Sequence, residues 1–328
     1  MLSFFLEELS ITNKEVQFVD TKKPIIHKDK KLVCIETTLN RISHLQSSIE
    51  NIERNVDKNQ YVIFKFETIR GRENRIKSVY PKFIARIIIF LEFILHRAIP
   101  RLPLFGSIYR KLTNGRIRII SKAEGLGRLV YAGFEIILVE NIDGLCTALL
   151  TAHKSKKELK KPSFGVLFKM SRIGKNGKKI GVYKIRTMHP YSEFLHSYIL
   201  KVNGYGEKGK PKNDFRVTSW GRILRKYWLD EIPQILNVLK LEMKLVGLRP
   251  VSEVYFNDLN ENDRKLRILS KPGCIPPYLA FNMNSSKEDV LLAEYKYLEM
   301  KKISPYTTDC IILLLAMKHI IFSKKRGT

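Results

Sequence analysis

The chain has 328 residues, with 59 Lys and Arg against 32 Asp and Glu, so its formal net charge is +27. This balance excludes an acidic soluble housekeeping enzyme, and 44% hydrophobic residues with 10% aromatic ones exclude global disorder. At roughly 100–200 residues per domain, the length predicts about two domains. The positive charge is expected to attract phosphate groups, whether in nucleic acid, anionic lipid or nucleotide substrates.

The cysteines and the N-terminus bear on the compartment. Cys34, Cys146, Cys274 and Cys310 lie far apart without a CxxC pair, which indicates neither a disulfide framework nor a zinc finger and favours a reducing compartment. Residues 1–8 turn from a short apolar start to carboxylates and lack basic residues, so no signal peptide is predicted. We therefore expect the chain on the cytoplasmic side.

Residues 1–153 are predicted to form an α/β domain. Apolar patterning predicts strands at 32–35 and 61–66 with a helix at 39–52 between them, a β-α-β arrangement. Two further strands, at 134–139 and 146–152, are joined through an Asp-Gly turn.

The order of these last elements resembles the closing section of a class I methyltransferase fold. No Gly-rich loop follows a first strand, and no acidic residue stands where a cofactor ribose would be held. We therefore expect a degenerate methyltransferase-like scaffold or partner-docking domain that binds no methyl-donor cofactor.

Residues 83–95 are strongly apolar, with only Arg86 and Glu92 interrupting them. A membrane span needs about 20 residues, so this run is too short to cross a bilayer. Two interpretations remain open. The run is an ordinary core helix of the N-terminal domain, or the segment 83–105 dips into one leaflet and returns.

Residues 154–163 form a basic linker that is too polar to pack, and residues 164–328 are predicted as a second domain. Strands at 164–173 and 179–187 flank an Asn-Gly pair, which predicts a type I′ hairpin. Lys184 and Arg186 lie two apart on one strand and hence on one face, which suits a phosphate. A solvated edge strand explains them equally well.

The segment Leu229-Asp-Glu-Ile-Pro-Gln234 carries two adjacent carboxylates. Read alone, Asp230 is a helix N-cap, Glu231 lies at the positive end of a helix dipole, and Pro233 occupies the first turn. Two adjacent helical carboxylates point about 100° apart, so they suit separate tasks better than a shared proton.

Several motifs occur in a fixed order and together resemble the bacterial sugar transferase family, monotopic phosphoglycosyl transferases that start surface-glycan assembly. The resemblance covers about residues 164–322. Its motifs are Tyr183-Lys-Ile-Arg-Thr-Met188, Asp214-x-Arg216-x-Thr218-x-x-Gly221, Leu229-Asp-Glu-Ile-Pro-Gln234, Asn237-Val-Leu-Lys and Leu245-Val-Gly-Leu-Arg-Pro250.

The resemblance implies transfer of sugar 1-phosphate from a nucleotide diphosphate sugar to polyprenyl (undecaprenyl) phosphate at the cytoplasmic face of the inner membrane. Such a reaction initiates exopolysaccharide, capsule, O-antigen or glycoprotein glycan synthesis. Asp230 would be the nucleophile that forms an Asp-linked phosphosugar, and Glu231 would hold Mg²⁺. The phosphate-binding residues it implies are Lys184, Arg225 and Arg249, with Arg186 and Arg216 as weaker candidates.

The chemistry fits these residue types. A carboxylate that attacks a diphosphate needs cations to neutralise the repulsion between anions. Mg²⁺ takes one or two carboxylates plus phosphate oxygens. A covalent intermediate divides the reaction into two displacements, so the nucleotide leaves before the lipid reacts.

Two features depart from the family. The long apolar re-entrant helix that normally precedes the basic hairpin is replaced by 154–162, and the run that marks common hexose donors is missing after 271–277. The sugar is therefore not predicted. The last apolar run, about 13 residues to Phe322, is also too short to span a bilayer but suits its interface. Attachment is therefore expected to be monotopic or peripheral.

Two other functions remain open. One is a catalytically inactive scaffold of a glycan pathway. The other is a basic nucleic-acid-binding protein, although the chain has no RNP-like or helix-turn-helix signature, and no specific nucleic acid is expected.

Overall fold

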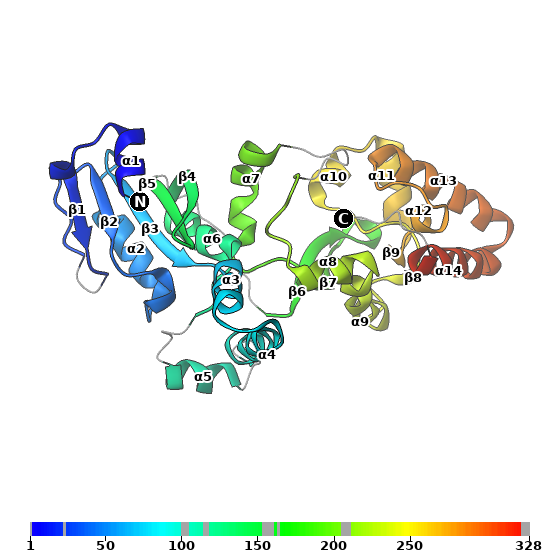
Figure 1. Ribbon diagram of the computed structural model, residues 1–328. Coiled ribbons are helices and arrows are strands. Elements are labelled where there is room, and N and C mark those ends of the chain that lie inside the picture. The colour runs from blue at the N-terminus through cyan, green and yellow to red at the C-terminus, as the bar shows by residue number, and fades with distance from the viewer. Residues whose placement is uncertain are drawn as a thin grey trace. The chain divides into compact units, whose positions relative to one another are not determined.

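The computed structural model divides into two compact units (Figure 1). Unit 1 contains residues 1–163, 189–204 and 211–216, and unit 2 contains residues 164–188, 205–210 and 217–328. The residues that the structure describes are 2–21, 24–99, 105–113, 118–152, 161–162, 165–204 and 211–322.

Unit 1 is built on a five-stranded sheet of order β1-β2-β3-β5-β4. The strands are β1 (Val16–Val19), β2 (Leu32–Ile35), β3 (Tyr61–Glu67), β4 (Phe134–Ile142) and β5 (Leu145–Ala152). β1, β2 and β3 are parallel, whereas β5 runs antiparallel to both β3 and β4. This mixed sheet confirms the predicted α/β class.

The two faces of this sheet bury different side chains. The α-helices of unit 1 are α1 (Leu2–Leu9), α2 (Leu45–Asn55), α3 (Ile69–Val79), α4 (Lys82–Phe93), α5 (Phe105–Thr113), α6 (Lys122–Ala132) and α7 (His196–Asn203). Val33 and Ile35 belong to the core that includes α2, α6 and α7, while Leu32 and Cys34 pack with Phe5 of α1. Successive strand residues point to opposite faces, so alternate residues of β2 pack into the helical layers on the two sides of the sheet.

The predicted β-α-β arrangement is confirmed by the parallel β2-α2-β3 segment. The Asp-Gly turn is confirmed as well, since Asp143 and Gly144 have φ of 52° and 77°. The helix predicted at 39–52 is confirmed from Leu45 onward, but its bounds are wrong, because a short 3₁₀ turn (Leu39–Arg41) precedes α2 and α2 runs on to Asn55. Helix α1 and strand β1 were not predicted, and the methyltransferase resemblance stays a prediction.

The predicted domain boundary needs one correction. Residues 189–204 and 211–216 fold with unit 1 although they follow the basic hairpin. The reason is burial, because Leu195 and Ile199 are fully enclosed in the core of unit 1. Most of the predicted basic linker, residues 154–160 and 163, lies outside the described residues.

Unit 2 opens with an antiparallel hairpin of β6 (Leu167–Ile173) and β7 (Lys179–Ile185). Its predicted type I′ turn is confirmed, since Asn176 and Gly177 have φ of 57° and 73° and Lys178 N donates to Lys175 O at 3.2 Å. The remaining elements are α8 (Ser219–Lys226), the 3₁₀ segment η7 (Leu229–Gln234), α9 (Ile235–Leu239), β8 (Lys244–Val246), α10 (Glu253–Asn257), α11 (Glu261–Leu269), β9 (Gly273–Ile275), α12 (Pro277–Ala280), α13 (Lys287–Ile303) and α14 (Pro305–Phe322).

Helix α14 is longer than predicted. It begins at Pro305, so it has 18 residues with a mean hydropathy of 1.3, and only 17% of it is buried. Within the described part of the chain it is long and apolar enough to cross a membrane by length and composition, and the prediction of a run too short to span is wrong on those grounds. Its buried residues Thr308, Ile312 and Ala316 recur every four positions, so one face packs on unit 2.

Candidate active site

The site is built on β7 and the segment that follows α8. Asn237 of α9 is fully buried, and its side chain accepts a hydrogen bond from Tyr183 N at 3.0 Å and donates one to Gly181 O at 2.9 Å. These bonds hold α9 and the preceding η7 beside β7. Residues on η7 are thereby brought next to Lys184 of β7.

Asp230 and Glu231 lie in the first turn of η7, directly after Trp228, whose φ of 59° reverses the chain. Trp228 occupies the cap position, and no side chain caps the segment. Asp230 is half-buried and forms no hydrogen bond or ion pair with any residue in the described ranges. The capping role that its sequence position suggested is therefore not what Asp230 does.

Glu231 is held from two sides. Lys184 forms an ion pair with one carboxylate oxygen, and the Gln234 side-chain amide donates to the other. Lys184 and Glu231 have side-chain exposures of 21% and 19%, so the pair is largely shielded from water. The Gln234 carbonyl oxygen Oε1 is buried with no hydrogen-bond partner among the described residues.

Two arginines join this charged cluster. Burial lowers the pKa of Arg172 on β6, and repulsion from Arg249 lowers it further, whereas Glu231 acts in the opposite direction. Arg249 is anchored through its backbone N–H, which donates to Glu294 at 3.0 Å, and its guanidinium lies 5.4 Å from the Tyr278 ring centre. Sequence reasoning did not select Arg172; its position on the strand paired with the Lys184 strand was the available signal.

Arg225 is fixed on α8. Its Nε donates to Thr187 Oγ1 at 2.9 Å, and Thr218 caps the same helix by accepting from Gly221 N at 2.9 Å. Thr218 also donates to the Thr187 carbonyl at 3.0 Å, so α8 is tied to the chain just after β7. The Thr-x-x-Gly motif thus sets the position of Arg225.

The two weaker candidates have other partners. Arg186 donates to Gly165 O at 3.0 Å and lies over the Phe168 ring. Arg216 is buried in unit 1, where it forms a bidentate pair with Asp214 at 2.8 and 2.7 Å. The described contacts therefore bring Lys184 and Glu231 together but assign Arg216 a structural partner.

Residues of η7 carry oxygen atoms of the type that magnesium binds. Within the described residues there is no group of three or more His, Cys, Asp or Glu side chains able to hold a metal. Mg²⁺ does not require one, because it binds one or two carboxylates together with substrate phosphates and water. Asp230, Glu231 and the unpartnered Gln234 Oε1 supply oxygens of that kind.

Two other features of unit 2 lie apart from this chemistry. Burial, reinforced by Glu231, raises the pKa of Cys274 to about 12, which favours the protonated thiol near neutral pH. A cavity of about 570 Å³ is lined by apolar residues such as Val238, Met243 and Leu313, and its lining includes neither Asp230 nor Glu231. The cavity therefore does not mark the carboxylate pair.

Residues 133–323 match the family described as bacterial sugar transferase. The chain belongs to this family. The match covers β4 and β5 of unit 1 as well as unit 2.

Curated relatives match shorter or longer stretches of the chain. This chain is 29% identical to galactosyl transferase CpsE of Streptococcus agalactiae, over half of this chain and 36% of that protein. It is 30% identical to the UDP-N-acetylgalactosamine-undecaprenyl-phosphate N-acetylgalactosaminephosphotransferase of Aeromonas hydrophila, over 62% of this chain and 46% of that one. Undecaprenyl-phosphate galactose phosphotransferase of Salmonella typhimurium is 39% identical over 31% of this chain and 22% of its own length. The chain thus spans less than half the length of these relatives.

Proposed function

We propose that the chain transfers sugar 1-phosphate from a nucleotide diphosphate sugar to undecaprenyl phosphate, the first step in assembling a surface polysaccharide. The observation that carries this proposal is the Asp230 carboxylate, which has no partner in the described ranges and is adjacent in sequence to Glu231, whose charge Lys184 neutralises. The names of two relatives, which are undecaprenyl-phosphate sugar phosphotransferases, support the same class of reaction. The lipid substrate implies work at the membrane, and we propose its cytoplasmic face.

In the first step, an Asp230 carboxylate oxygen attacks the sugar-linked phosphorus of the donor. The new bond is an acyl phosphate, and the bond from this phosphorus to the bridging oxygen breaks. Nucleoside monophosphate leaves with that oxygen and its electron pair. Arg172 and Arg249 carry the positive charge that lowers the repulsion between the attacking carboxylate and the diphosphate.

In the second step, a phosphate oxygen of the lipid attacks the same phosphorus. The acyl-phosphate bond breaks, Asp230 returns as a carboxylate, and the product is an undecaprenyl diphosphate sugar. Each displacement exchanges one oxygen–phosphorus bond for another, so no oxidant or further reactant is needed. Lys184 keeps Glu231 in place through both steps.

Mg²⁺ is the proposed cofactor. Glu231 and the Gln234 carbonyl oxygen are the residues proposed to hold it, and when bound it would neutralise charge on the diphosphate. The Lys184 ammonium would then balance the carboxylate from the other side. Asp230 stays available for attack because it has no protein partner among the described residues.

The test is to incubate membranes containing the chain with a panel of nucleotide diphosphate sugars and undecaprenyl phosphate. Release of many equivalents of nucleoside monophosphate with one donor is the expected result, with repeated turnover dependent on the lipid and all release abolished in Asp230→Asn. If the wild-type chain releases no nucleoside monophosphate with any donor, although it is as well folded as Asp230→Asn and Glu231→Gln, the proposal is contradicted. That result would favour an inactive scaffold.

A further inference from the structure

Helix α4 is apolar and almost entirely uncovered. Of its twelve residues only Ala85 is buried. Phe83 and Phe90 are 74% and 60% exposed, and Ile84, Ile87 and Leu91 are exposed as well. With about 100° of rotation per residue these five side chains fall within an arc of roughly 120°, so they form one continuous apolar stripe.

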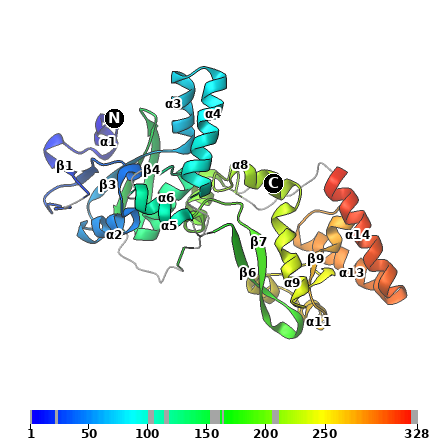
Figure 2. The same ribbon diagram turned by 90° about the horizontal axis from the view of Figure 1, so that it is seen from below.

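The opposite side of α4 faces α3. Figure 2 shows the two helices side by side, extending away from the sheet of unit 1 as a helical hairpin. Ala85 and Glu92 lie roughly opposite the stripe, and Glu92 receives a bidentate pair from Arg72 of α3 at 2.7 and 2.6 Å. The stripe therefore lies on the face of α4 that α3 does not cover.

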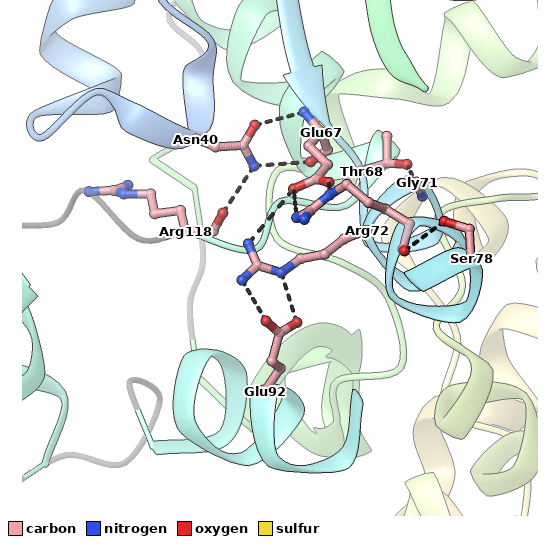
Figure 3. A network of polar contacts seen from close by, with 9 residues as sticks. Asn40, Glu67, Thr68, Gly71, Arg72, Ser78, Glu92 and Arg118 are labelled. Carbon is pink, nitrogen blue, oxygen red and sulfur yellow. Dashed lines mark hydrogen bonds and ion pairs between the residues drawn. The ribbon is translucent and has the colours of Figure 1, made fainter. Parts of the chain in front are cut away.

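The hairpin is braced at its base rather than loosely attached (Figure 3). Asn40 accepts from Glu67 N at 2.7 Å and donates to the carbonyls of Glu67 and Arg118, both at 3.0 Å. Thr68 caps α3 by accepting from Gly71 N at 3.0 Å. The end of β3 therefore holds the hairpin in a fixed orientation while its apolar face stays open.

The charge around the stripe is positive. Both acids of the hairpin are paired, Glu92 with Arg72 and Glu73 with Lys77. Lys82 and Arg86 are exposed and flank one edge of the stripe. Nearby in the chain, α5 presents Ile108 and Leu112, which are 57% and 80% exposed. A hydrogen bond of 2.5 Å between His96 Nδ1 and the Tyr109 hydroxyl joins α5 to the π-helical turn after α4.

We propose that the α3–α4 hairpin of unit 1 docks on an anionic lipid bilayer, with the α4 stripe embedded in one leaflet. An apolar face bordered by Lys and Arg matches acyl chains beneath anionic headgroups. At twelve residues, α4 is roughly 18 Å long, which is too short to cross the hydrocarbon core. The core-helix interpretation of residues 83–95 does not fit a helix with one buried residue. The proposal does not depend on the transferase activity.

A local probe tests this docking without interference from α14. Cys34, Cys146 and Cys274 are buried, so Cys310→Ser leaves no exposed cysteine among the described ones. In that background Phe90→Cys carries a polarity-sensitive fluorophore, and Phe18→Cys, at an exposed apolar position on β1, is the matched control. The full chain is mixed with vesicles of phosphatidylcholine, with or without phosphatidylglycerol.

We expect a blue shift at position 90 with the anionic vesicles, a weaker one with phosphatidylcholine alone, and none at position 18. In flotation, Ile87→Glu should lower binding to the anionic vesicles by about tenfold or more, while Phe18→Glu leaves it unchanged. Nucleoside monophosphate release in detergent should be the same for Ile87→Glu and wild type, which separates docking from catalysis.

Three results would overturn the proposal. One is vesicle binding with no shift at position 90, and another is failure of the wild-type chain to float with anionic vesicles. The third is a shift that appears without vesicles and grows with protein concentration, which would assign the stripe to a second copy of the chain.

Discussion

Asp230 differs from two other carboxylates of unit 2 in having no partner among the described residues. Asp258 and Asp309 each pair with a lysine, whereas Asp230 makes no bond with any residue in the described ranges. A half-buried carboxylate without a structural bond is free to act on a substrate. This is the residue-scale basis of the proposed mechanism.

Asp230→Asn should abolish transfer and leave the fold intact. The amide keeps the side chain's shape but removes the attacking oxyanion, so nucleoside monophosphate release should fall by at least about a thousandfold. Since no hydrogen bond is lost, the free energy of unfolding should change by less than about 0.5 kcal/mol, measured in urea. The control is Asp258→Asn, which loses an exposed ion pair with Lys287 and should retain activity.

Glu231→Gln should act on the metal rather than on the nucleophile. The amide still offers an oxygen but not the charge that Lys184 balances, so a higher Mg²⁺ concentration should be needed for half-maximal release. A titration of Mg²⁺ against initial rate checks this. An unchanged Mg²⁺ requirement would remove Glu231 from the proposed metal site.

At the scale of elements, the position of α8 depends on the absence of a side chain at Gly221. A Cβ there would stand 2.3 Å from the Thr187 carbonyl oxygen and 2.6 Å from Thr218 Oγ1. Gly221→Ala should therefore shift α8, displace Arg225 and lower the free energy of unfolding by about 1–3 kcal/mol. The measurement is thermal unfolding of Gly221→Ala, with Arg222→Ala at an exposed position on the same helix as the control. Equal melting temperatures would show that α8 adjusts without cost.

The α3–α4 hairpin should weaken in acid. The Arg72 guanidinium holds the pKa of Glu92 below its ordinary value of about 4.3. The stabilisation from this pair is therefore complete above about pH 4.3 and is lost as the pH falls through the lowered pKa. Partial exposure limits it to about 1 kcal/mol.

Urea unfolding of wild type and Glu92→Gln over a pH series tests this dependence. The difference in free energy of unfolding should be largest near neutral pH and should shrink in acid. A difference that grows with acidification would contradict the assigned direction of the Glu92 pKa.

Across the whole molecule, short sequence patterns predicted the turns and the elements that form from neighbouring residues. The Asn-Gly turn, the Asp-Gly turn and the β2-α2-β3 segment follow from backbone preference and apolar spacing, so sequence sufficed for them. The adjacency of Lys184 and Glu231 is a contact across 47 positions that no spacing rule gives, and only the family resemblance pointed to it.

Other features depend on tertiary packing that the sequence does not display. Residues 189–204 return to unit 1 because Leu195 and Ile199 bury in its sheet core. Arg216, by contrast, pairs with Asp214 only two residues earlier, a local contact of the kind that made it a weaker phosphate candidate. The exposure of α4 could not be predicted because an apolar helical stripe reads the same whether protein or lipid covers it.

In the proposed mechanism, Asp230 becomes covalently bound to the sugar phosphate. The most direct measurement mixes wild-type protein with donor and Mg²⁺ in the absence of lipid, followed by rapid quench and intact-protein mass spectrometry. We expect one equivalent of nucleoside monophosphate and a mass gain of one sugar phosphate, localised to Asp230 and absent in Asp230→Asn. Release only when donor and lipid are both present, with no adduct at any quench time, would contradict it and indicate direct transfer.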